Sequence, residues 1–383
     1  MIMDEQAVSR LKLPACWTLA AVALFCLPIE SGPVLWAQGE MPSATRAAVE
    51  PEMKPGCYLW GGSDPWQFGQ KIPNRAIAKW EADNGWAGQH HLLEIDLSSY
   101  YDREGRGRFI PKGLDLQIAL AKRIIDGGGE VQMMVWATPA HLATVPLSSK
   151  DPNGRASWMK YKPRDFDAWA AIFAEVMERV AAKVDMNHVW VGIGMEAHRY
   201  KFRSSADDFL RLVDATQAKL KPLNLPHVGM TQVPDLIDDQ LGRMKHFVPT
   251  FDFIERYLGM GRRNGWQVDF LPIFEYSSDV ARMRSCIRKA RGLLDTYGFG
   301  DAEIIWNGLS PEREIRDKQK GVEACIAMGK MLRSEGIGRA CWDFLEDSEP
   351  RTRKQHDNGL LEYQTLRERP RYKLAKGVSA TGW

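Results

Sequence analysis

A glutamate stands where the sequence changes from an apolar run to a polar loop. Residues Val191 to Met195 are all apolar or glycine, and Glu196 follows them directly. A carboxyl group in such surroundings is poorly solvated, so it holds its proton more tightly and can act as a general acid near neutral pH. We therefore take Glu196 as the leading candidate for acid/base chemistry. A salt bridge from Glu196 to Arg199 or Arg203 is the purely structural alternative.

Aromatic and polar side chains recur near the ends of the apolar runs. Indole and phenol rings can stack on the apolar C–H faces of pyranose rings, while amide and imidazole groups fix the hydroxyls. A core tryptophan has the same signature, and Trp169 on a helix face is an example. The candidates for substrate binding are Trp60, Trp136, His198, Tyr257, Trp306, Asn307 and Trp342.

Basic residues also gather around the candidate glutamate. They could attract an acidic sugar such as a uronate by charge. Alternatively, they could neutralise the acids Glu196, Asp207 and Asp208. We prefer this second interpretation. The basic residues are Arg199, Lys201, Arg203 and Arg256.

Motifs of several other chemistries are missing from the sequence. The eight histidines are scattered, and His90 and His91 should point to opposite faces of a strand. Neither an HExxH motif nor a DxDxDG loop occurs, so we expect no metal. A GxSxG nucleophile motif is also missing. The glycines around Gly259 have the wrong spacing for a dinucleotide fingerprint, and we predict no cofactor.

Short apolar runs alternate with amphipathic helical patterns along most of the chain. This alternation predicts a parallel sheet with crossover helices. The clearest helix spans 166–184, and another spans 114–125 and stops at three glycines. Ser205 and the Ser310-Pro311-Glu312 segment predict capped helix starts. The expected strands are 57–61, 91–97, 131–137, 189–195, 227–233, 251–257, 303–307 and 340–344.

Eight strand and helix units can close into a barrel. The sequence therefore predicts an α/β protein with a single (β/α)8 TIM barrel rather than an open doubly wound sheet. In such barrels the functional groups gather at the carboxyl ends of the strands. This rule places Glu196 at the mouth.

Several segments resemble the clan of retaining glycoside hydrolases with (β/α)8 barrels, and most of all the β-xylosidase-like family 39. In that clan the fourth strand ends in Asn-Glu, with the glutamate as acid/base, and here Met195-Glu196 occupies the place. Residues 340–344 resemble the eighth strand, whose tryptophan floors the sugar subsite. Residues 109–144 and the segments 359–361 and 369–372 extend the resemblance, which implies a glycosidase fold and a carbohydrate substrate.

One departure from that clan concerns the nucleophile. The seventh strand should carry a second carboxylate, yet residues 303–307 read Glu-Ile-Ile-Trp-Asn, with Glu303 at the wrong end of the strand. Hydrolysis by the usual route needs two carboxyl groups. Our first choices for the second are Asp343 and Glu275. Further candidates are Glu346, Asp347, Glu255 and Asp96.

Three functions remain open on this basis. The first is a glycoside hydrolase that acts on a polysaccharide or oligosaccharide, with Glu196 as general acid/base. The second is a non-hydrolytic pseudoenzyme that binds carbohydrate, for example in exopolysaccharide handling. The third is another carbohydrate-active reaction such as a lyase, with a partner chosen from His198, Tyr200, Arg256 and Tyr257.

The N-terminal segment predicts export. Arg10 and Lys12 precede the apolar stretch Leu13 to Ile29, and Leu35-Trp36-Ala37 offers a cleavage site. We expect residues 1–37 to be a signal peptide, 38–55 a flexible lead-in and 56–383 one glycoside-hydrolase-like domain. The mature protein would then be periplasmic or extracellular, with no integral membrane span.

Composition and cysteine content limit the partners. The formal charge of +2 and the spread of Lys and Arg give little support for a nucleic-acid partner, and the oligomeric state stays unknown. Four cysteines follow the predicted signal peptide, and they match no CxxC pattern. Cys57 and Cys341 should lie on neighbouring strands, and Cys286 and Cys325 on consecutive helices, so that disulfides and buried thiols both stay open.

Overall fold

A computed structural model describes residues 52–57, 59, 75–150, 157–197, 201–234, 236–237, 248–309, 318–342, 368 and 370–381. Contacts between Cα atoms divide the chain into Met1–Ala47 and Ala48–Trp383, and all described residues belong to the second unit. No helix in the described ranges is both long and apolar enough to cross a membrane. The predicted signal peptide lies outside these ranges.

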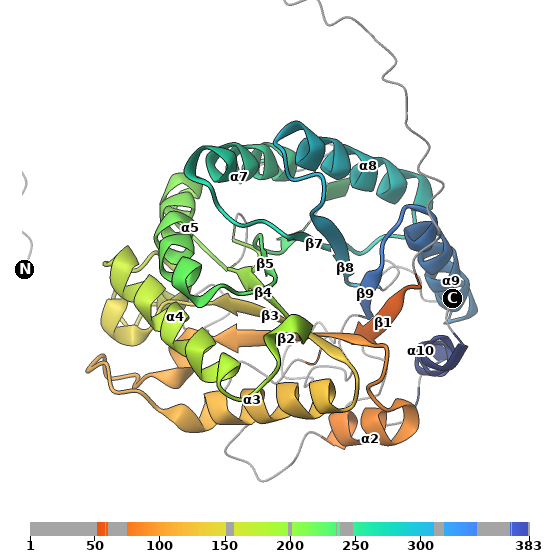
Figure 1. The fold of residues 1–383 in the computed structure, drawn as a ribbon, viewed down its shortest axis with the longest axis horizontal. Coiled ribbons are helices and arrows are strands. Elements are labelled where there is room, and N and C mark those ends of the chain that lie inside the picture. Colours follow the sequence, from red (N-terminus) through yellow and green to blue (C-terminus); the bar gives the residue numbers. More distant parts are fainter. Residues whose placement is uncertain are drawn as a thin grey trace, which may run out of the picture. The chain divides into compact units, whose positions relative to one another are not determined.

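The described strands form one parallel sheet in the order β1-β9-β8-β7-β5-β4-β3-β2, with β6 beside β7. β5 and β6 are two short pieces of one segment, so the nine strands occupy eight strand positions around the barrel. The sheet makes a nearly closed barrel, as predicted (Figure 1). The strands are β1 (Lys54–Cys57), β2 (His90–Asp96), β3 (Glu130–Trp136), β4 (Val189–Ile193), β5 (Val228–Gly229), β6 (Val233–Pro234), β7 (Phe270–Phe274), β8 (Glu303–Asn307) and β9 (Arg339–Trp342).

Two hydrogen bonds join β1 and the residues after it to β2. The backbone N–H of Leu59 donates to the carbonyl of Leu92 over 2.9 Å. The N–H of Cys57 donates to Nδ1 of His91 over 3.2 Å. Since β1 also pairs with β9, these bonds link the two ends of the sheet, β1 and β2.

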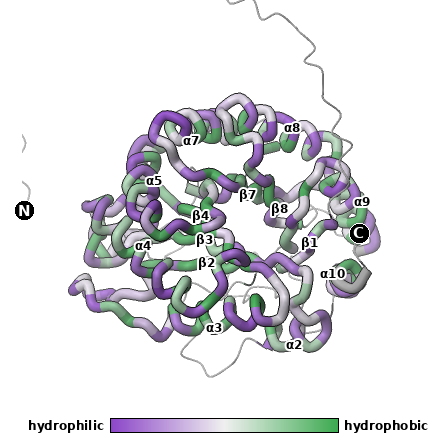
Figure 2. The backbone as a smooth tube through the Cα atoms, viewed as in Figure 1, coloured by the Kyte–Doolittle hydropathy of each residue, from purple (hydrophilic) through white to green (hydrophobic). Residues whose placement is uncertain are grey.

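Helices surround the barrel and bury their apolar faces against it. In Figure 2 the central strands are mostly hydrophobic, and the helices alternate between hydrophobic and hydrophilic positions. This pattern is what a helix with one buried face requires. The described α-helices are α2 (Arg75–Asn84), α3 (Pro111–Asp126), α4 (Phe166–Ala181), α5 (Ala206–Leu220), α7 (Thr250–Asn264), α8 (Val280–Thr296), α9 (Lys318–Ser334) and α10 (Pro370–Thr381).

Side-chain caps fix the starts of several helices. Ser205 accepts a hydrogen bond from the N–H of Asp208 at the start of α5, as predicted, and Asp165 caps α4 in the same way. The helix expected over 114–125 is α3, which begins with Pro111 at its first position. The predicted cap at Ser310 lies outside the described residues.

One expected strand was wrong. Residues 251–257 lie in helix α7, and the sixth stave is instead β7, Phe270–Phe274. The buried residues Phe251, Ile254 and Leu258 recur at spacings of three and four, which is a helical period that a short apolar run conceals. The sequence analysis did not predict β7, which contains Pro272, and proline is rare inside a strand. The other seven expected strands each overlap an observed stave.

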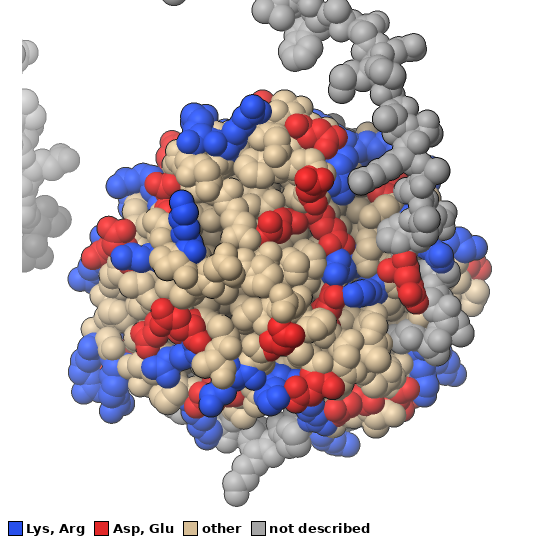
Figure 3. Space-filling view, viewed as in Figure 1, with Lys and Arg blue, Asp and Glu red and all other residues tan. Residues whose placement is uncertain are grey.

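Charged side chains fill the barrel near the amino ends of its strands. The guanidinium of Arg339 donates to Glu130 over 2.6 Å and 3.1 Å, and it also contacts Glu303. Lys54 pairs with the same Glu130, and the ring of His90 lies 3.4 Å from it. Figure 3, viewed in the direction of Figure 1, shows acidic and basic groups side by side near the centre of the barrel. This cluster joins β1, β2, β3, β8 and β9.

Candidate functional site

Glu196 lies just beyond the carboxyl end of β4, as the barrel rule predicted. Its backbone N–H donates to the carbonyl of Gln232 over 3.0 Å, and Met195 forms a bridge with the same residue. Glu196 adopts a φ of 46°, a left-handed conformation that is uncommon outside glycine. Ala137, at the end of β3, has a φ of 71°. Strained backbone of this kind is concentrated at functional sites.

Lys201 connects the loop after β4 to the end of β2. Its backbone N–H donates to the carbonyl of Glu196 over 3.3 Å. Its ammonium group donates to Oε1 of Glu94 over 2.8 Å, and the Glu94 side chain is only 3% exposed. The loop that carries Glu196 is therefore held against β2 by a largely buried ion pair.

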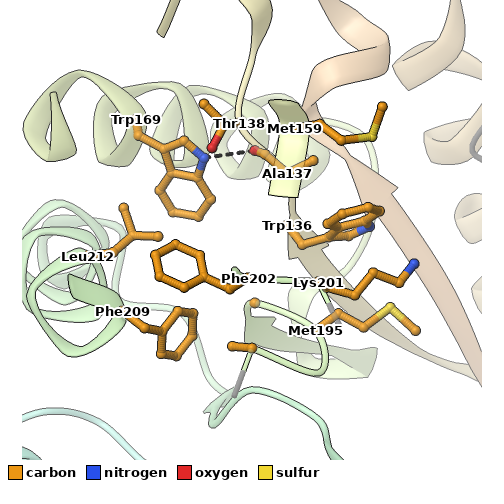
Figure 4. Close-up of a pocket in the computed structure, with 12 residues that line it drawn as sticks. Trp136, Ala137, Thr138, Met159, Trp169, Met195, Lys201, Phe202, Phe209 and Leu212 are labelled. Carbon is orange, nitrogen blue, oxygen red and sulfur yellow. Dashed lines mark hydrogen bonds between the residues drawn. The ribbon is translucent and has the colours of Figure 1, made fainter. Parts of the chain in front are cut away.

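The ammonium of Lys201 also covers one face of Trp136, at 4.1 Å from the ring centroid. Figure 4 shows Lys201 and Met195 beside Trp136, with Trp169, Phe202, Phe209 and Leu212 on the opposite side of the pocket. That face of Trp136 is therefore not open to a stacked sugar. The indole N–H of Trp136 is buried and finds no acceptor in the described part of the chain.

Charges set the protonation of Lys201. Its side chain is about 22% exposed. Burial alone would lower the pKa of Lys201, but the charges of Glu94 and Glu196 and the hydrogen bond to Glu94 outweigh it, and the pKa is raised. Asp96 adds to the same effect. Lys201 is consequently charged.

Asp96 is a second buried acid at the end of β2. Its Oδ1 accepts hydrogen bonds from the N–H of Ser98 over 2.9 Å and from the Ser98 hydroxyl over 2.6 Å, which caps the short helix Leu97–Tyr100. Its Oδ2 has no hydrogen-bond partner among the described residues. Burial raises the pKa of Asp96 to about 6, although Ser98 opposes the shift. Asp96 can therefore hold a proton near neutral pH.

Strand β8 ends in an amide, Asn307, and the positions at which the clan resemblance expects a carboxylate are the apolar residues Ile305 and Trp306. Ile305 packs inside the barrel against Trp190 and Phe270. Because strand side chains alternate, Asn307 points inward as well, and its buried amide has no partner among the described residues. Glu303 stands at the amino end of β8 and contacts Arg339. Within β8 itself, no acid therefore lies at the mouth.

Glu275 follows β7 directly. The sequence analysis named Glu275 and Asp343 as first choices for the second carboxylate, and of these two only Glu275 lies in the described residues. Its backbone N–H donates to the carbonyl of Asn307 over 3.3 Å, so it lies beside the end of β8. Its Oε2 accepts a hydrogen bond from the N–H of Ile237 over 3.1 Å. Glu275 is 7% exposed. Asp343 lies outside the described residues.

Three of the aromatic candidates were placed wrongly by the sequence argument. Tyr257 belongs to α7 and is buried in the core between strands and helices. Trp306 and Trp342 are on strands, but their side chains are buried in that same core rather than in the mouth. Trp60 and His198 lie outside the described residues.

Two of the four basic residues have acidic partners in the structure, and Arg199 lies outside the described residues. Arg256 lies on α7 and contacts Asp207, and Lys201 pairs with Glu94. The interpretation that these basic residues neutralise nearby acids is thus supported for Arg256 and Lys201. These two residues therefore give no support to an acidic sugar as the substrate. Glu94 and Gln232, by contrast, were not named as candidates. Alternation within residues 90–96 was the signal for Glu94, since it shares a face with Asp96.

Comparisons with known proteins identify the same fold in carbohydrate-active enzymes. A glucosidase from Croceicoccus marinus matches with a TM-score of 0.58 and 14% identity, covering 87% of this chain and 68% of that one. The glycoside hydrolase family 53 catalytic domain from Ignisphaera aggregans has a TM-score of 0.55 and 14% identity, covering 88% and 98%. A Bifidobacterium longum family 5 protein, solved with Manβ1-4GlcNAc, has a TM-score of 0.56 and 11% identity, covering 86% and 78%.

No protein-family model matches the sequence. No curated protein matches it either. At these identities the solved structures show the (β/α)8 fold alone, and the specific resemblance to family 39 stays an expectation from sequence.

Proposed function

We propose that this chain is an exported glycoside hydrolase-like protein that acts on a polysaccharide or oligosaccharide, with Glu196 in acid/base chemistry. The observation that carries the proposal is the position of Glu196. It follows the fourth stave of the barrel in a strained conformation, beside a Lys201 that interacts with Glu94. The fold is one that glucosidases, mannosidases and endoglucanases share.

Among the described residues, the candidates for the second carboxylate of this proposal lie on β2 and directly after β7. Glu94 and Asp96 lie at the end of β2, and Glu275 lies at the end of β7. Asp343, from the sequence argument, stays a candidate. Asn307, Gln232 and the indole N–H of Trp136 are buried polar groups without partners among the described residues, and they would bind sugar hydroxyls.

A non-hydrolytic carbohydrate-binding function is the second candidate. The inward amide of Asn307 at the end of β8 favours it, because an amide can bind a hydroxyl but cannot serve as the nucleophile of a retaining glycosidase. A lyase has less support, since Arg256 and Tyr257 belong to α7 and Tyr257 is fully buried.

Replacing Glu196 by Gln separates these functions. We expect Glu196→Gln to lose at least about 100-fold in turnover on a panel of glycans while it still binds the sugar, because the shape is kept and the proton-transferring group is lost. The assay is product release by chromatography together with calorimetric titration of the same glycan. Glu175→Gln, at an exposed pair on α4, is the matched control. A parent protein that binds glycans and cleaves none would instead support the binding function.

A further inference from the structure

Two neighbouring strands of the barrel lead into a residue with left-handed backbone. Ala137 follows β3 with a φ of 71°, and Glu196 lies just beyond β4 with a φ of 46°. β3 and β4 pair in parallel, and the N–H of Gly194 donates to the carbonyl of Val135 over 2.8 Å. The two turns therefore leave the sheet side by side. Within the described ranges, Asn224 is the one further non-glycine residue with a positive φ.

Trp169 of α4 holds the first of these turns. Its indole N–H donates to the carbonyl of Ala137 over 2.8 Å, which is the bond drawn as a dashed line in Figure 4. Trp169 is 2% exposed, and it lies in the first turns of α4, whose start is capped by Asp165. The donor therefore has a fixed position that a helix supplies, rather than the loop itself.

Thr138 adds two bonds directly after the same turn. Its N–H donates to the carbonyl of Met159 over 2.9 Å, and its hydroxyl donates to the carbonyl of Tyr161 over 2.6 Å. Met159 in turn packs against the cluster that contains Trp136. These contacts hold the segment Trp158–Lys162 beside the end of β3.

The same segment also holds the loop after β4. The carbonyl of Lys160 accepts a hydrogen bond from the N–H of Arg203 over 2.6 Å. The N–H of Lys162 donates to the hydroxyl of Ser204 over 3.0 Å. Because this loop begins at Glu196, the backbone of Glu196 is fastened to the loop after β3 as well as to its own strand.

The turn after β3 is strained where glycine would make it without strain. Gly194 has a φ of 84°, and glycine adopts such values freely. Ala137 has a Cβ that disfavours this region, so its conformation persists because the surrounding contacts over-determine it. The bonds from Trp169 and Thr138 are those contacts. Strain maintained in this way is concentrated where groups must be placed accurately.

We propose that Trp169 is a positioning residue for Glu196. Its bond to Ala137 fixes the turn after β3, and that turn fixes the segment Trp158–Lys162. The segment then fixes the loop of Glu196 through the N–H of Arg203. Trp169 acts through the backbone and not on the substrate. This inference rests on the proposed function, because the acid/base chemistry of Glu196 belongs to that proposal.

A double-mutant cycle tests the role of Trp169 at the turn without any glycan. Ala137→Gly should raise the melting temperature of the parent by about 2 °C, because glycine adopts a positive φ freely. Trp169→Phe keeps an aromatic ring in the core and removes the N–H donor, so the turn can relax. The gain from Ala137→Gly should therefore fall by at least about half in that background. An equal gain in both backgrounds contradicts the proposal.

Kinetics of the full chain test whether the turn acts on Glu196. On a glycan that the parent cleaves, Trp169→Phe should lower kcat by about 10–100-fold and change KM by less than about 3-fold, because a misplaced acid affects the chemical step more than binding. An unchanged kcat overturns the proposal.

Trp266→Phe is the matched control for these measurements. The indole N–H of Trp266 also donates over 2.8 Å, to Asp214, but Trp266 lies between α7 and the amino end of β7. Trp266→Phe therefore loses a bond of the same kind at the opposite end of the barrel, and it should keep the parent kcat. An equal fall of kcat in Trp266→Phe and Trp169→Phe contradicts a specific role for Trp169.

A separate variant covers the case in which Trp169→Phe does not fold. Thr138→Val keeps the shape of the side chain and removes the hydroxyl bond to Tyr161, so kcat should fall as well; a parent-like kcat contradicts the proposal. The two proposals fail separately, since a parent that cleaves no glycan contradicts the hydrolytic function alone. The crystal structure of the Trp169 or Thr138 variant then decides the positioning role. A displaced Glu196 backbone supports it, and an unmoved one overturns it.

Discussion

At the scale of single residues, the site is built from acids that the fold treats unequally. Glu196 and Glu94 lie next to a lysine, whereas Asp96 is buried beside another acid. Sequence reasoning found Glu196 from its place after an apolar run. It could not foresee that Lys201 would lie over Trp136, because that contact joins a loop to a strand that is distant in sequence.

Asp96 should reduce the stability of the protein at neutral pH. The folded carboxyl holds its proton up to about pH 6, while an unfolded one loses it near pH 4, so the folded state loses stability as the pH rises through this window. Asp96→Asn removes the titration and keeps an acceptor for Ser98. We expect it to raise the free energy of unfolding by about 1–3 kcal/mol at pH 7, and by much less at pH 4.

Urea unfolding at the two pH values checks this prediction. Asp165→Asn is the control, since Asp165 caps α4 through the N–H of Ala168 at an exposed position. An equal gain for Asp96→Asn at pH 7 and pH 4 would show that the carboxyl charge is not the cause.

The aromatic residues show where residue-level prediction stops. Trp306 and Trp342 are near strand ends, but each faces the surrounding helices because of its parity in the strand. A slip of one residue exchanges the two faces, and the family resemblance had fixed no parity for Trp306. Asn307, one residue further on, is the group that points inward.

At the scale of elements, the barrel closes between β1 and β2 through a histidine. His91 faces Trp80 and Trp86, and its Nδ1 accepts the N–H of Cys57. His90, the adjacent residue, contacts Glu130 inside the barrel. The sequence had predicted opposite directions for the two rings, and this was confirmed.

His91 should make stability depend on pH. Burial lowers its pKa to about 3, whereas an unfolded imidazole is protonated below about pH 6.5, so stability is lost as the pH falls from 6.5 toward 3. We expect His91→Gln to flatten this dependence, which amounts to at most about 1.4 kcal/mol per pH unit. At pH 7 the variant should lose about 1–3 kcal/mol, because the buried N–H of Cys57 loses its partner.

Denaturant unfolding at pH 7, 6 and 5 measures both effects. The matched control is His188→Gln, at an exposed position in a short helix before β4. Parallel pH dependences for His91→Gln and the parent would rule out His91 as the source.

Elements also differ in how far the sequence predicts them. β3 and β8 were placed within one residue at each end, because their apolar runs are short and bounded by turns. Residues 251–257 were misassigned, since a helix that is buried on one side can contain a strand-like run. The real β7 contains a proline, which local propensity argues against.

At the scale of the whole molecule, the four cysteines described by the structure are free and buried. Cys57 has Trp342 as its register partner, and Cys341 has Gly56. Cys57 therefore faces the helices, and Cys341 faces the barrel interior with Leu92. The prediction that Cys57 and Cys341 lie on neighbouring strands was correct. Their side chains point to opposite faces of the sheet, so the two residues cannot form a disulfide.

These thiols should react only when the molecule opens. Burial raises the pKa of Cys325 to about 12 and also raises those of Cys57 and Cys341, which suppresses the reactive thiolate. We expect an alkylating reagent at pH 8 to modify Cys57, Cys286, Cys325 and Cys341 slowly, and all of them at the rate of global unfolding. Peptide mass spectrometry against time measures this, with urea-unfolded protein as the control. Rapid modification of one of the four would show local opening there.

The charged cluster inside the barrel joins segments that are far apart in the chain. Arg339 meets Glu130 across 209 residues, and the thiol of Cys341 meets the His90 carbonyl across 251. During translation, β1 and β8 must therefore wait with unpaired edges until β9 leaves the ribosome. Exposed strand edges invite pairing with other chains, and contacts of such long range form slowly. We therefore expect the nascent chain to need chaperones most late in synthesis, when every strand except β9 has been made.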